Sequence, residues 1–149
     1  MEHEERNAVS ALISGVVTFM LFGRDIWEGT VAGTYDTDQG LSLWAWDVLW
    51  LIGGGIVVCI VVLIAFQILY AIATNTENPT FVTDERDHMI SRRGSLVTLF
   101  VISASFLIAV VMLSQNWGPL AAFNTILLGM FAGSMFADIY RVAVYRLGL

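Results

Sequence analysis

The side chains best suited to bind a metal ion or to take part in chemistry lie between positions 84 and 88. Asp84, Asp87 and His88 follow one another at spacings of three and four residues, which places three possible metal ligands on one face of a helix. A second interpretation needs no metal, because carboxylates in the first turn of a helix complement its dipole. Pairs such as Asp84 with His88 then form a network that also contacts the C-terminal end of the last helix. We favour this structural interpretation and expect neither a metal nor a cofactor.

Two further motifs are incomplete. His3 and His88 both lie outside the apolar segments, so a haem held by two histidines within a bilayer has no ligands here. The run Asp36-Thr37-Asp38-Gln39-Gly40 has the alternating carboxylates and the glycine of a partial calcium loop. A third acidic ligand and a distal glutamate are absent from it, and the alternative is a solvated turn.

Several polar side chains lie within or at the edges of long apolar segments. They are Asp47, Gln67, Ser103, Ser105, Asn124, Asp138 and Arg141. An ionisable residue inside a membrane is a functional candidate, but Asp47 lies among tryptophans and Asp138 comes about one membrane crossing after Pro119. We therefore expect both to be interfacial, and Arg141 one turn after Asp138 predicts a local ion pair. No nucleophile or acid–base pair accompanies them, so we expect no enzyme activity.

The elements that must position these residues are membrane helices. Between Gly94 and Ala137 the chain has no charged side chain, and its only interruption is Asn116-Trp117-Gly118-Pro119. One crossing takes roughly 20 apolar residues, so this span predicts two antiparallel crossings, with Pro119 opening the second. Because 57% of the 149 residues are hydrophobic and 13% are charged, we expect an all-α, single-domain, four-helix transmembrane bundle.

The expected helices cover approximately residues 7–23, 43–73, 84–115 and 118–147. The first follows an acidic start, Met1 to Arg6, which lacks the basic region of a cleavable signal, so we interpret it as a retained helix. A polar connection from Gly23 to Ser42 is expected to separate the first two helices. Trp44, Trp46 and Trp50 are typical of an interfacial aromatic belt.

Charge limits the partners of the chain. It contains no lysine, and its net charge is -6, so it lacks the basic patch that nucleic-acid binding requires. Its one cysteine, Cys59, cannot form an intramolecular disulfide. Membrane lipid, a protein partner and further copies of the chain remain as partners.

The distribution of arginine predicts orientation. Six arginines flank one side of the predicted crossings, and only Arg24 lies on the other. Because arginine is retained on the cytoplasmic side, we expect a multi-pass protein of the bacterial inner membrane with both termini in the cytoplasm. The six arginines are Arg6, Arg86, Arg92, Arg93, Arg141 and Arg146.

Two groups of small residues could let helices approach closely. They are Gly53, Gly54 and Gly55 in the second predicted helix, and Gly129 and Gly133 in the fourth. Packing within one chain and a homodimer seam are both open as interpretations.

The run Asp84-Glu85-Arg86-Asp87, with Ile90 and a basic residue following before an apolar helix, resembles a known signature. The pattern Asp-Glu-Arg-Asp/Glu-x-x-Ile-x-x-Lys/Arg occurs in small uncharacterised bacterial membrane proteins with about four helices. That family has no established activity to transfer. Some of its members are encoded beside small helix-turn-helix regulators, and the resemblance therefore implies membrane capture of a cytoplasmic protein.

The segment from Asn75 to Gly94 is the most polar part of the chain. We expect the chain to be a non-enzymatic accessory or regulatory protein that binds a partner through this segment. The residues expected to make the contact are Asp84, Glu85, Arg86, Asp87, Arg92 and Arg93. The alternative is a homo-oligomeric channel or small-solute carrier that uses Gln67, Asn124, Ser103 and Asp138.

Overall fold

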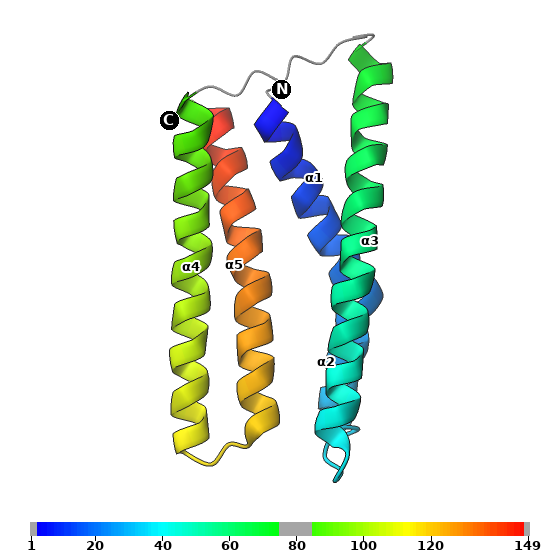
Figure 1. Ribbon diagram of the computed structural model, residues 1–149, viewed down its shortest axis with the longest axis vertical. Coiled ribbons are helices and arrows are strands. Elements are labelled where there is room, and N and C mark those ends of the chain that lie inside the picture. The colour runs from blue at the N-terminus through cyan, green and yellow to red at the C-terminus, as the bar shows by residue number, and fades with distance from the viewer. Residues whose placement is uncertain (1–2, 75–84, 148–149) are drawn as a thin grey trace. The chain divides into compact units, whose positions relative to one another are not determined.

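The computed structural model describes residues 3–74 and 85–147, and these residues form an all-α structure (Figure 1). Four helical spans are long and apolar enough to cross a membrane: Glu5–Val31, Gly40–Ala73, Glu85–Ser114 and Pro119–Leu147. The predicted fold class and the number of crossings are therefore confirmed. The chain divides into two compact units, one made of residues 10–79 and the other of residues 1–9 and 80–149. Each unit is described by itself.

The first crossing is longer than the sequence predicted. It runs through α1 (His3–Thr18), the π-helical turn η1 (Phe19–Gly23) and α2 (Arg24–Val31) without a break. The predicted connection from Gly23 to Ser42 is therefore wrong in its first part, because the helix continues for eight residues beyond Gly23. Arg24 donates to Glu28 one turn on at 2.5 Å, and Ile26 is buried, so this amphipathic turn has both a side-chain pair and an apolar contact to hold it.

The π turn places aromatic rings against glycines. A Cβ atom at Gly23 would lie 2.6 Å from the Phe19 ring, and one at Gly54 would meet the Phe22 ring. Thr18 packs in the same way at Gly55, 3.0 Å from the position of a Cβ atom. The contact between the first crossing and α3 (Gly40–Thr74) is thus a close fit of side chains onto bare backbone.

Tyr35 closes the connection between the first two crossings. Its hydroxyl donates to the Asp47 carboxylate at 2.6 Å, and its backbone lies so close to Gly40 that a Cβ atom there would overlap it. Burial raises the pKa of Tyr35 above its ordinary value, and the hydrogen bond to Asp47 raises it further. A tyrosine is already protonated at neutral pH at its ordinary pKa, so Tyr35 is the donor in this bond.

The last two helices form the predicted hairpin. α4 (Glu85–Ser114) ends just before the turn, and α5 begins at Pro119 and runs to Leu147. Asn116 and Gly118 adopt positive φ angles of 60° and 87° in the turn, conformations that asparagine and glycine tolerate best. The tetrapeptide turn expected from the sequence is confirmed.

Small residues line the seam between α4 and α5. The buried positions of α4 include Gly94, Ser105 and Ala109, and those of α5 include Ala122, Gly129, Gly133 and Ala137. A Cβ atom at Gly129 would collide with the Oγ and Cβ atoms of Ser105, and one at Gly133 would lie 3.2 Å from the Thr98 carbonyl oxygen. Thr98 also donates its hydroxyl to the Gly133 carbonyl at 3.2 Å, so the two backbones pack closely.

Candidate functional site

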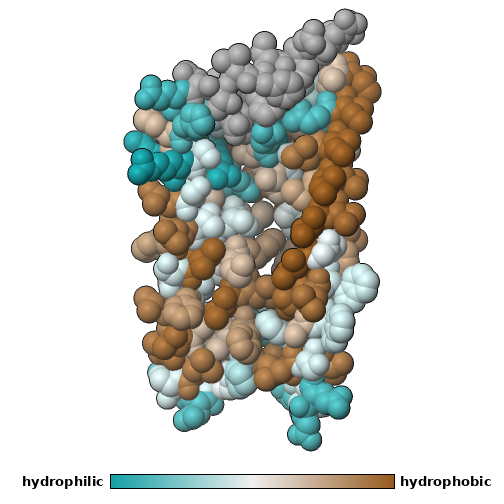
Figure 2. Space-filling model, viewed as in Figure 1, coloured by the Kyte–Doolittle hydropathy of each residue, from teal (hydrophilic) through white to brown (hydrophobic). Residues whose placement is uncertain are grey.

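The unit made of residues 1–9 and 80–149 has a polar end. This end brings together the start of α4, the end of α5 and the first residues of α1. In Figure 2 hydrophilic side chains on the α4 and α5 side gather at the end where α4 begins, and hydrophobic ones cover the middle of the same helices. Three contacts organise this end. Each joins a carboxylate to a tyrosine or an arginine.

Asp87 is the first of these carboxylates. It lies on the buried face of α4 together with Ile90 and Gly94, because positions three and seven residues on fall on the same side of a helix. It accepts a hydrogen bond of 2.7 Å from the Tyr145 hydroxyl of α5. The predicted network between this segment and the C-terminal end of the last helix is therefore confirmed in this bond.

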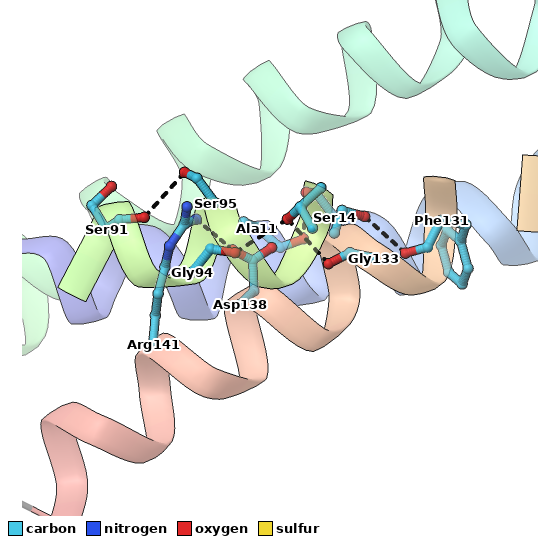
Figure 3. A network of polar contacts seen from close by, with 11 residues as sticks. Ala11, Ser14, Ser91, Gly94, Ser95, Phe131, Gly133, Asp138 and Arg141 are labelled. Atoms are coloured by element: carbon cyan, nitrogen blue, oxygen red, sulfur yellow. Dashed lines mark hydrogen bonds and ion pairs between the residues drawn. The ribbon is translucent and has the colours of Figure 1, made fainter. Parts of the chain in front are cut away.

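Asp138 is the second. It is buried, and Arg141 donates to it at 2.9 Å, which confirms the ion pair expected from their spacing. Figure 3 shows the Arg141 side chain reaching from α5 toward Gly94 of α4, and a Cβ atom at Gly94 would lie 2.7 Å from Arg141 Nε. Gly94 thus leaves the space that the guanidinium occupies. Nε itself is buried and has no hydrogen-bond partner among the described residues.

Glu5 is the third, and it joins the two ends of the chain. Its side chain is only 12% exposed and lies 3.4 Å from Arg146 Nε, whereas the Arg146 side chain is 66% exposed. The neighbouring Arg6 is buried. The first residues of α1 therefore contact the end of α5 within one compact unit.

These contacts leave the two kinds of charge in different places. Asp87, Asp138 and Glu5 turn inward, and of the carboxylates whose side chains are described in this unit only Glu85 is exposed. The arginines differ from these carboxylates in exposure, because the long aliphatic stem of an arginine can carry its guanidinium outward to solvent. The exposed arginines at this end are Arg86, Arg92, Arg93 and Arg146. Among the residues whose side chains are described at this end, exposed arginines therefore outnumber exposed carboxylates.

The predicted partner-binding residues fall into separate groups. Glu85 and Arg86 are exposed on the first turn of α4, Arg92 and Arg93 are exposed two turns further along, and Asp87 is turned toward α5. Asp84 and the rest of residues 75–84 lie outside the described residues. Asp87 is therefore a residue that holds α4 against α5 rather than one that faces a partner.

Apart from the Asp138–Arg141 pair, the predicted intramembrane polar residues lie far apart along their helices. In α5, Asn124 precedes Asp138 by about 21 Å of helix, and in α3, Asp47 precedes Gln67 by about 30 Å. Ser105 donates to the Ile102 carbonyl of its own helix at 2.8 Å. These residues do not form a continuous polar row along one helix.

The predicted packing glycines differ in use. Gly54, Gly55, Gly129 and Gly133 each lie against a side chain or backbone of the neighbouring helix, but a Cβ atom at Gly53 would meet nothing within 4 Å. Among the described residues no three carboxylate, histidine or cysteine side chains lie close enough to hold a metal ion. Asp36 and Asp38 of the partial calcium loop belong to that set of described residues.

Sequence reasoning missed three residues of these contacts: Tyr145, Glu5 and Tyr35. One signal was present for the first, since Asp87, Ile90 and Gly94 recur on one helical face and predict that Asp87 is turned inward. A buried carboxylate requires a donor, and Tyr145 is a polar residue in the last turns of the facing helix. No local pattern pointed to Glu5 or Tyr35.

Comparisons with family models, with curated proteins and with solved structures find no match for this chain.

Proposed function

We propose that this chain is a non-enzymatic accessory or regulatory protein of the bacterial inner membrane, with both termini in the cytoplasm, and that it binds a cytoplasmic protein partner through the first turn of α4. The observation that carries the proposal is the sorting of charge at this end. Asp87, Asp138 and Glu5 are turned into the protein and hydrogen-bonded or ion-paired there. Arg86 and Glu85 are exposed.

The exposure of arginines at this end favours a partner that carries carboxylates. Exposed arginines attract carboxylates, and charge complementarity guides association more than it adds affinity. Met89, which is also exposed, adds an apolar contact beside Arg86 on the same helix. A partner surface with carboxylates around an apolar patch fits this end best.

Charge reversal at Arg86 tests the proposal. Tagged wild-type protein is cross-linked in native membranes, and the recovered partner is measured against the bait by quantitative mass spectrometry. We expect Arg86→Glu to lower recovery of a stoichiometric partner at least about fivefold, because an attractive contact worth about 1 kcal/mol becomes repulsive. Arg86 is exposed on the first turn of α4, where a glutamate is compatible with the helix dipole.

The matched control is Arg24→Glu, which reverses another exposed arginine, in α2. It is expected to leave recovery unchanged. Wild-type protein that yields no stoichiometric partner, or Arg86→Glu protein that retains it in full, contradicts the proposal.

A further inference from the structure

The exposed apolar surface of α4 marks where the membrane begins. Large hydrophobic side chains are exposed along this helix from Leu96 to Leu113. These 18 positions span about 27 Å at 1.5 Å per residue, which is close to the thickness of the hydrocarbon core. Trp117, just beyond the far end, is also exposed and is typical of an interfacial residue.

This length places Arg92 and Arg93 at headgroup depth. Both are exposed, and Arg93 precedes Leu96 by three residues, or about 4.5 Å of helix. Glu85 and Arg86 lie about 9 to 12 Å further from the membrane along the same helix. The four exposed charges therefore occupy two depths, one in water and one beside lipid phosphates.

Along α4 the exposed carboxylate nearest to these two arginines is Glu85, seven residues before Arg92. Between Asp87 and Asp138 the chain contains no carboxylate. Asp87 accepts from Tyr145, and Asp138 is paired with Arg141. Both carboxylates are buried, so among the described residues of α4 and α5 no exposed carboxylate lies beside Arg92 and Arg93, and exposed apolar side chains follow them from Leu96 onward.

We propose that Arg92 and Arg93 bind the headgroup of an anionic phospholipid whose acyl chains lie along Leu96, Leu99 and Phe100. Adjacent positions on a helix differ by about 100°, and position 96 falls between positions 92 and 93 when viewed down the axis. Two guanidiniums thus flank the start of one apolar strip, and each can donate two parallel hydrogen bonds to a phosphate.

The apolar strip favours a lipid over a free anion. Phe100 is 75% exposed and Leu99 is 61% exposed, and only a ligand with hydrocarbon chains gains from covering them. The inference stands independently of the protein partner proposed above, because it rests on Arg92 and Arg93 rather than on Arg86.

Lipid binding to the purified full chain tests the inference. Phosphatidylglycerol and phosphatidylcholine with the same acyl chains are titrated separately into detergent solution, and bound lipid is counted by native mass spectrometry. We expect tighter binding of phosphatidylglycerol. Each interfacial arginine contributes about fivefold to binding of anionic lipid, so Arg92→Gln/Arg93→Gln should weaken phosphatidylglycerol binding about 25-fold and change phosphatidylcholine binding much less.

Arg24→Gln/Arg86→Gln is the matched control, since it removes the same charge from two exposed arginines that are not beside Leu96. It should alter phosphatidylglycerol binding less than twofold. Arg92→Lys/Arg93→Lys keeps both charges and should stay within about fivefold of wild type, which provides a test if the glutamine variant does not fold.

Four results overturn the inference. Phosphatidylglycerol and phosphatidylcholine bind equally well to wild type, or the control loses as much binding as the glutamine variant, or the lysine variant loses as much as the glutamine variant. The fourth is that another ligand binds as tightly as phosphatidylglycerol and loses its binding in the glutamine variant. Such binding of glycerol 1-phosphate would make the surface a phosphate site, and such binding of a glutamate-rich peptide would make it a protein docking site.

Discussion

Two carboxylates at the polar end of α4 and α5 are buried and hydrogen-bonded, and so they stabilise the structure rather than face solvent. Asp87 accepts a hydrogen bond from Tyr145 at 2.7 Å, and Asp138 accepts one from Arg141 at 2.9 Å. A buried carboxylate is costly unless it is hydrogen-bonded. The Asp87–Tyr145 bond joins α4 to α5, whereas the Asp138–Arg141 pair lies within α5 and sets the position of the guanidinium beside Gly94.

Removing the Tyr145 hydroxyl tests this role. Tyr145→Phe is expected to destabilise the protein by about 1.5 to 3 kcal/mol, because it leaves the Asp87 carboxylate without this donor. Thermal unfolding in detergent, followed by circular dichroism, should show a fall in Tm of several degrees.

Tyr140→Phe is the control, because it removes a hydroxyl from a half-buried tyrosine on the same helix. Equal loss of Tm in the two variants would show that the Asp87 bond carries no special share of stability.

At the scale of the helices, glycine has two uses that the sequence does not distinguish. Gly129 gives Ser105 the room to pack against α5, whereas Gly53 faces open space. The first position permits close approach of two helices. The second has no contact within 4 Å to explain it, and a side chain there meets no obstacle.

A pair of alanine substitutions separates these uses. Gly129→Ala should destabilise the hairpin by about 1 to 3 kcal/mol through overpacking against Ser105. Gly53→Ala should leave stability unchanged or raise it by up to about 1 kcal/mol, because alanine favours the helix. Thermal unfolding in detergent measures both.

The collision at position 129 includes the Cβ atom of Ser105, which no rotation of the hydroxyl can move. Ser105→Gly should therefore restore part of the stability lost in Gly129→Ala. A double variant no more stable than Gly129→Ala would contradict the packing argument.

At the scale of the whole molecule, the start of α1 and the end of α5 belong to one compact unit. Residues 1–9 cluster with residues 80–149, and Glu5 pairs with Arg146. If each of the four apolar helical spans crosses the membrane once, the proposed topology has both termini on one side. Arginine predominates on that side in the sequence, which supports a cytoplasmic location for both termini.

Cysteine labelling tests this orientation. In a Cys59→Ala background, single cysteines replace Asp38, Asn116, Arg86 or Arg146, and intact cells are treated with a membrane-impermeant maleimide. Asp38 and Asn116 lie in the connections that precede α3 and α5, which the proposed topology places outside the cytoplasm, so Asp38→Cys and Asn116→Cys should react in intact cells.

Arg86→Cys and Arg146→Cys should react only after lysis, because the positive side is expected in the cytoplasm. Labelling of either in intact cells would reverse the proposed orientation. It would also remove the cytoplasmic partner from the proposed function.

The sequence by itself determined the fold class, the four crossings and the turn before Pro119. Those features follow from long uncharged runs and from proline and glycine, whose effects are local and do not depend on the rest of the fold. The Asp138–Arg141 pair was also predictable, since both residues lie on one turn of one helix.

Only the tertiary structure decided which charges are exposed. Asp87 and Glu85 look alike in sequence, but one is turned toward Tyr145 and the other faces outward. The extension of the first crossing to Val31 was missed for a related reason, because a polar stretch can continue a helix when Arg24 pairs with Glu28 and Ile26 is buried. Partners that are distant in the chain, such as Glu5 and Arg146, become neighbours only once the helices pack.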